Sequence, residues 1–208
     1  MSKMAQAVYT IGHSNHSFED FVKLLQRHSI TAIADVRSIP VSNHNPQFNR
    51  DVLSVALRRQ NISYVFMGKE LGGRPDDPSY YDNGQADYLR IADKPIFKKG
   101  LNRLLEGKTQ YRIALLCSEK EPLDCHRTIL ISRVLYKMGI PVRHILANGE
   151  VEDHQNTEQR MVTSLGIGSQ LFDYSLPMKD RVEKAYHEQA RKIAYKLHQQ
   201  EDNNEYSE

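Results

Sequence analysis

Two thiols, an imidazole and a guanidinium stand close together in the middle of the chain. Cys117 follows the apolar run 113–116, and Cys125-His126-Arg127 opens a segment with helical apolar spacing. This pattern predicts a short buried strand, a polar loop and the start of a helix. In open parallel sheets, ligands bind at such strand-to-helix junctions. We therefore expect the functional site at this junction.

The two thiols are expected to differ in reactivity. We expect Cys125 in the first helical turn, with Asp124 as the N-cap, where backbone N–H groups and the neighbouring His126 and Arg127 favour the thiolate. Cys117 is expected at the end of a buried strand, where desolvation favours the neutral thiol or a simple core role. A small alkylating reagent should therefore label Cys125 before Cys117.

Two other arrangements of the same residues stay open. In phosphatases and rhodanese-like sulfurtransferases, a thiol at a strand end is followed by an anion-binding loop and an arginine. Here nine residues separate Cys117 from Arg127, and the loop carries Glu119 and Glu121, which disfavours an anion cradle. Alternatively, both thiols with His126 and His13 offer the sulfur and nitrogen ligands of a metal site. The cysteines are not in a tight zinc-knuckle spacing, so we assign no metal ligand and leave the cofactor unknown.

Polar residues also follow the other predicted strands, which are residues 7–11, 32–36 and 64–67. Because a parallel sheet brings these ends to one edge, we expect a shared pocket there. The arginines would bind phosphate or carboxylate, and Asp35 would hold Arg37 or act as a base. We predict catalytic roles for Cys125, Cys117, His13, Asp35 and His126, and substrate binding by Ser14, Arg37, Arg74, Arg127 and Gly72.

Alternation of strand-like and helix-like segments predicts an α/β fold, a three-layer sandwich with a mostly parallel sheet of about five strands. The fourth and fifth strands are residues 113–116 and 142–147, and helices are expected from Ser17, from Asn49 or Arg50, and over 88–105 with a break before Pro95. We divide the chain into an α/β domain, 1–150, and an extension, 151–208. The extension should contain a charged helix, 179–198, that packs on the domain through Val182, Tyr186, Ile193 and Leu197, followed by a disordered tail from Glu201. A dimer contact is the other role open to this helix.

Composition excludes several classes of protein. The net charge is +2, 39% of the residues are hydrophobic, and there are two cysteines in 208 residues. Such a charge does not demand a nucleic-acid or membrane partner, and two cysteines do not make a disulfide framework. Since we find no apolar run long enough for a membrane span and no signal-peptide core, we expect a cytoplasmic protein. The oligomeric state is left open.

Four segments together resemble a known family. They are YTIGHSNHSFEDFVKLL, IADVRSIP, ELGGRP and LLCSEKEPLDCHR, and they span roughly Val8 to Leu146. In this order they closely resemble the DUF488 family of uncharacterised proteins. The resemblance implies a compact α/β domain and points to the same residues as the strand-end argument, but it adds no reaction.

We expect an enzyme that acts on an anionic small molecule or a nucleotide-like substrate, assisted by a cysteine. The alternative is a non-catalytic nucleotide or nucleic-acid binding module that uses Arg37, Arg74 and Arg127, with the Tyr80–Tyr88 loop stacking on bases. Salt separates the two, because binding to a phosphate backbone weakens steeply with ionic strength.

Overall fold

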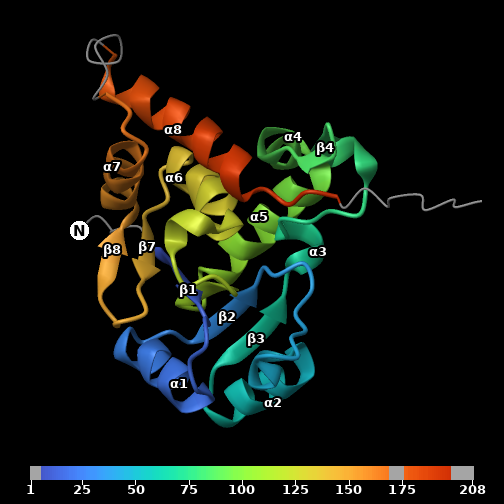
Figure 1. Cartoon of the computed structure of the whole chain (residues 1–208). Helices are drawn as coiled ribbons and strands as arrows, with labels where there is room; N and C mark the ends of the chain where they lie inside the picture. The colour runs from blue at the N-terminus through green and yellow to red at the C-terminus, as the bar shows by residue number, and fades with distance from the viewer. Residues whose placement is uncertain (1–5, 169–175, 198–208) are drawn as a thin grey trace, which may run out of the picture.

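A computed structural model describes residues 6–168 and 176–197 and has a six-stranded sheet at its centre (Figure 1). The strand order is β3-β2-β6-β1-β7-β8, and all neighbours are parallel except β7 and β8. The strands are β1 (Val8–Gly12), β2 (Ala32–Asp35), β3 (Ser63–Phe66), β6 (Ile113–Cys117), β7 (Val142–Ile145) and β8 (Val151–Asp153). The mostly parallel α/β sheet predicted from the sequence is confirmed, with β8 as an additional strand.

Helices cover both faces of the sheet, so the fold has three layers (Figure 1). One face packs on α1 (Phe18–Arg27) and α2 (Arg50–Arg59). The other face packs on α3 (Gly68–Leu71), α4 (Tyr88–Asp93), α5 (Pro95–Gly107), α6 (Arg133–Lys137), α7 (His154–Ser164) and α8 (Met178–Ile193), beside the small hairpin β4 (Tyr81–Asp82) and β5 (Gln85–Ala86). No helix within the described residues is long and apolar enough to cross a membrane.

Side-chain alternation along each strand supplies both cores. In β6, Ala114 and Leu116 pack toward α1 and α2, whereas Leu115 and Cys117 pack toward the opposite layer. The Cys117 side chain therefore points to the side of the sheet that carries α3 to α8. This orientation decides which side chains the Cys117 thiol can contact.

The expected helix starts are largely confirmed. Ser17 caps α1 by accepting the backbone N–H of Asp20, and α4 and α5 are separated at Lys94, before Pro95. The apolar residues of α2 do not all pack inward, because Val52 and Val55 are 54% and 49% exposed. A helix buries one stripe, and in α2 that stripe is Leu53 and Leu57, four residues apart.

The chain after residue 150 joins the same sheet and the same core. β8 pairs with β7, and α8 buries Ala185 and Tyr186 against the domain, so the predicted packing of this helix is confirmed. Leu197, predicted on the buried stripe, lies beyond the end of α8 and is 46% exposed. His198 and the tail from Glu201 lie outside the described residues.

A chain of buried hydrogen bonds ties this C-terminal part to the sheet. Thr10 Oγ1 lies 2.8 Å from His144 Nδ1, and His144 Nε2 lies 2.9 Å from His154 Nδ1. His154 Nε2 in turn lies 2.8 Å from the Tyr186 hydroxyl. Burial lowers the pKa of His144 well below its usual value and that of His154 to about 4, so both rings are neutral near pH 7.

Candidate functional site

The loop after β6 brings the second thiol back toward the first. Pro122–Asp124 forms a 3₁₀ turn whose start is capped by the Glu121 side chain. Cys125 is extended, with φ −136° and ψ 140°, and its carbonyl accepts the N–H groups of Thr128 and Ile129. Cys125 is therefore the N-cap, and the expectation that Asp124 is the cap is wrong by one residue. The cause is Pro122, which favours a 3₁₀ turn that absorbs Asp124.

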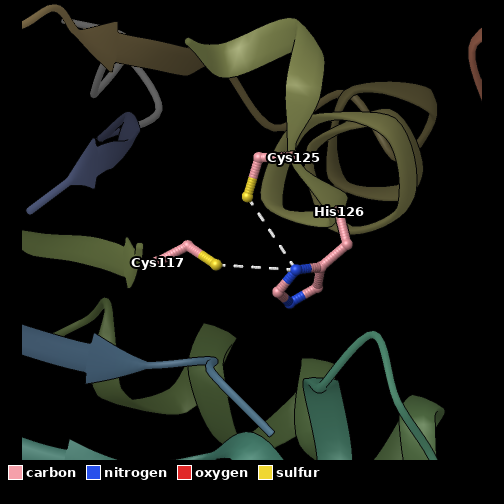
Figure 2. A group of neighbouring side chains, drawn as sticks. All are labelled: Cys117, Cys125 and His126. Carbon is pink, nitrogen blue, oxygen red and sulfur yellow. Dashed lines mark hydrogen bonds between the residues drawn. The ribbon is translucent and has the colours of Figure 1, made fainter. Parts of the chain in front are cut away.

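Cys117, Cys125 and His126 converge on one point (Figure 2). The Nδ1 atom of His126 lies 3.6 Å from Sγ of Cys117 and 3.8 Å from Sγ of Cys125. Figure 2 shows the imidazole nitrogen facing both sulfur atoms, one from the strand end and one from the helix start. Both thiols are free and buried. Strand, loop and helix start thus form one sulfur–imidazole cluster.

The orientation of the imidazole is fixed from its other side. His126 Nε2 lies 3.0 Å from the carbonyl oxygen of Val36, the residue that follows β2. A carbonyl only accepts, so Nε2 carries the proton and Nδ1 faces the sulfurs. Gly73 packs against the ring, since a Cβ at this position would lie 2.9 Å from His126 Cγ. The second glycine of the ELGGRP segment is therefore required by this close approach.

The neighbours of Cys125 lower the pKa of its thiol. Burial would raise its pKa, but the hydrogen bond from Cys117, the charge of Arg127 and the contact with the His126 ring hold the pKa of Cys125 well below its usual value. Burial and the neighbouring Cys125 raise the pKa of Cys117. These directions agree with the ranking expected from the sequence, and the labelling order stays a prediction.

Glu119 is a further acid at the cluster, where the sequence indicated only an obstacle to anion binding. Cys125 Sγ lies 2.9 Å from Glu119 Oε2 and donates to it. Burial and the charge of Cys125 raise the pKa of Glu119. The lowered pKa of the thiol and the raised pKa of the carboxyl bring the proton affinities of the two groups closer together. In the sequence, only the position of Glu119, two residues after Cys117, indicated that this acid would lie at the cluster.

Arg127 holds the loop together instead of facing the cleft. Its guanidinium is fully buried, with Nη1 donating to the carbonyl of Glu119 at 2.6 Å and Nη2 donating to that of Lys120 at 3.3 Å. The loop therefore turns carbonyl oxygens, not amides, toward this arginine. That arrangement does not fit a phosphatase-like anion cradle. Arg127 was predicted to bind substrate, but its guanidinium donates to these loop carbonyls instead.

Arg37 is fixed by a buried ion pair. Its Nε and Nη2 atoms donate to the two carboxylate oxygens of Asp35, at 2.9 and 2.6 Å, and Tyr64 donates to the same carboxylate at 2.7 Å. Arg37 Nη1 lies 3.3 Å from Nε2 of His13, whose ring stacks on Phe48. Asp35 is thus an anchor for Arg37, and His13 stands behind Arg37 with its pKa lowered to about 4, chiefly by burial.

A cleft of about 450 Å³ opens at this edge of the sheet. Arg37, Cys117 and His126 line it together with Arg74, whose guanidinium lies 4.7 Å from the centre of the Tyr195 ring. Tyr195 follows α8, so the C-terminal part of the chain supplies one wall of the cleft. The predicted convergence of strand ends on one edge is confirmed for these residues.

The remaining predicted residues lie behind or beside this cleft. Ser14 and Gly72 line two other cavities, and Gly72 makes room for the Ser38 hydroxyl, which accepts the backbone N–H of Arg74. Sequence reasoning missed Tyr64 and Tyr195, because strand register and the path of the C-terminal segment bring them to the site. Of the four residues considered as metal ligands, Cys117, Cys125 and His126 lie together, whereas His13 lies apart from the two thiols.

Comparison with known proteins places this site in a family. No curated protein matches the chain. A family model described as "Domain of unknown function DUF488" matches residues 17–134, which include Arg37, Arg74 and the whole sulfur–imidazole cluster. Because the match covers more than half of the chain, the protein belongs to the DUF488 family.

Proposed function

We propose that this protein is an enzyme that acts on an anionic small molecule or a nucleotide-like substrate in the cleft at the carboxyl edge of the sheet. One observation carries the proposal: the Cys117 thiol and the His126 imidazole, 3.6 Å apart, line the same cleft as two arginines. A thiol and an imidazole within reach of each other can move a proton or activate a nucleophile. The arginines in the same cleft would bind the anion.

The two arginines would bind the anion in different ways. Within the described residues, the contacts to Asp35, Phe48 and His13 use all but one of the N–H groups of Arg37. The remaining Nη1–H is held rigidly for one substrate oxygen. Arg74 is exposed and stacks on an aromatic ring, so it adds net positive charge at the mouth of the cleft. A fixed donor beside an exposed cation suits a small anionic group such as phosphate or carboxylate.

Burial of the basic and aromatic residues favours an enzyme over a nucleic-acid binding module. Arg37 is 4% exposed, and Arg127 is fully buried against backbone carbonyls. Tyr80 and Tyr88 are 8% and 6% exposed, which leaves little ring area for stacking on bases. Nucleic-acid binding by these residues would require the loops around the cleft to open.

A substrate panel tests the proposal directly. The full chain would be incubated with phosphate monoesters, nucleotides and small carboxylate esters, and product formation would be compared with His126→Asn and Arg74→Ala. We expect His126→Asn to lower kcat by about 10²–10⁴-fold, as for loss of a proton-transfer group. Arg74→Ala should mainly raise KM, by about 10-fold for a lost contact of about 1.4 kcal/mol.

An arginine on the opposite side of the fold provides the matched control. Arg58 is exposed at the end of α2, away from the cleft, and Arg58→Ala should leave kcat and KM unchanged. The proposal would be refuted by a chain that turns over none of the panel and binds oligonucleotides with an affinity that falls steeply with salt.

A further inference from the structure

The separations inside the sulfur–imidazole cluster match those of a metal's ligand shell. The donor atoms of Cys117, Cys125 and His126 all lie within 4.8 Å of one another, and the two sulfur-to-nitrogen distances are 3.6 and 3.8 Å. A tetrahedral zinc site with Zn–S of about 2.3 Å and Zn–N of about 2.0–2.1 Å has sulfur-to-nitrogen edges of about 3.6 Å. An ion can therefore sit between the three atoms with little movement of the chain.

The imidazole is already oriented as a ligand. Its Nε2–H donates to the carbonyl of Val36, which leaves the lone pair of Nδ1 directed at the two sulfurs. Such a hydrogen bond from the far nitrogen is the usual support of a metal-bound histidine. The sulfur of Cys125 also accepts the backbone N–H of Arg127, at 3.4 Å. Both contacts stabilise a metal-bound cluster and neither blocks the ion.

We propose that Cys117, Cys125 and His126 bind one zinc ion, or a divalent ion of similar softness, and leave its fourth position open to the cleft. Two thiolates and one imidazole suit zinc better than they suit magnesium or calcium. Cys117 and His126 line the cleft, as does Glu119, so the open side of the ion faces the substrate space. Three protein ligands with one open position are typical of catalytic zinc, whereas structural zinc has four.

Binding needs no oxidant, because each protonated thiol only loses a proton as its sulfur–metal bond forms. Glu119, 2.9 Å from Cys125 Sγ, is placed to take that proton and pass it to solvent. This inference rests on the proposed function, because it assigns the same site a bound ion, which would replace proton transfer between Cys117 and His126 as the activating chemistry. A bound zinc would lower the pKa of a water in the open position, which would make hydrolysis of an anionic ester the reaction class.

Metal uptake by the reduced, full-length chain tests the site. We expect one equivalent of Zn²⁺ or Co²⁺ per chain, and the cobalt form should show a thiolate-to-metal charge-transfer band with the intense visible bands of four-coordinate cobalt. Cys117→Ser, Cys125→Ser and His126→Asn should each weaken metal affinity by about 100-fold or more, while keeping the far-UV circular dichroism of the folded chain. His44→Asn, which removes an exposed imidazole, should leave affinity unchanged.

The outcomes separate this inference from the proposed function. A reduced chain with both thiols titrating as free that takes up no Zn²⁺ at micromolar free metal overturns the metal site. If that metal-free chain still turns over an anionic substrate, the proposed function stands and the metal site alone is lost. A chain that binds one equivalent through these three residues but shows no turnover supports the metal site and counts against the function.

Discussion

Replacing Asp35 by asparagine should destabilise the protein by about 3–5 kcal/mol, the cost of leaving one member of a buried ion pair without its partner. Asp35 is fully buried, and its carboxylate accepts two guanidinium N–H groups and the backbone N–H of Arg37, together with the hydroxyl of Tyr64. The amide of asparagine keeps the shape but removes the charge, and its NH₂ group faces donors. Arg37, 4% exposed, would then carry an uncompensated positive charge.

Urea unfolding followed by circular dichroism measures this cost. With an m-value of about 2 kcal/mol/M, a loss of about 4 kcal/mol moves the midpoint by about 2 M. Tyr64→Phe is the matched control, because it removes one hydrogen bond from the same carboxylate and should cost only about 1 kcal/mol. The double variant Asp35→Asn with Arg37→Met should recover part of the loss. A cost below about 1 kcal/mol for Asp35→Asn, or a double variant less stable than the single one, would refute the reasoning.

Three further predictions concern the histidines, the extension and the glycine beside the site. His13 and His154 have a pKa of about 4 in the folded chain against 6.5 when unfolded, so the unfolded chain binds more protons between these values. The free energy of unfolding should therefore fall by about 1 kcal/mol per pH unit per histidine as pH drops from about 6.5 to 4, and His154→Gln should flatten that slope in urea titrations. Removing residues 179–208 strips the helix that buries Ala185 and Tyr186 and should lower Tm by about 10 °C, whereas removing 201–208 should not change Tm in a thermal melt. Gly73→Ala should displace the His126 imidazole and so weaken the affinity for zinc. The same change should lower the free energy of unfolding, measured in urea, by about 1–3 kcal/mol. An unchanged zinc affinity would contradict the close packing of Gly73 on the ring.

The sequence predicted those parts of the fold that local patterns encode. The buried run ending at Cys117 and the turn residues after each strand are local signals, so the sheet and its polar edge could be anticipated. The ion pair of Asp35 with Arg37 was also open to prediction, since the residues are two positions apart at a strand end. β8 (Val151–Asp153) was missed because a strand of three partly exposed residues has too short a pattern to recognise, and only its pairing with β7 defines it.

Non-local geometry accounts for what the sequence could not give at the site. Tyr64 reaches Asp35 only because β3 and β2 pair in a particular register. Arg127 was expected to face an anion, but whether a loop turns amides or carbonyls toward a side chain depends on its backbone conformation, which composition does not fix. The helix after Cys125 also begins with a π-helical segment, Arg127–Ser132, and no signal for that widening was found in the sequence. π-Helical turns occur often at functional sites, which agrees with its place beside the cluster.

The family match includes only some of the residues that line the cleft. The sulfur–imidazole cluster, Arg37 and Arg74 fall within residues 17–134, whereas Tyr195, which stacks on Arg74, lies well beyond them. The segment around Tyr195 is held in place by backbone hydrogen bonds to the hairpin, among them Ala86 N–H to the Tyr195 carbonyl at 2.9 Å. The groups that would do chemistry therefore come from the family domain, and the C-terminal segment shapes the entrance beside the more exposed arginine. Under the proposed function, a change in this segment should alter which anions enter the cleft before it alters the reaction at the cluster.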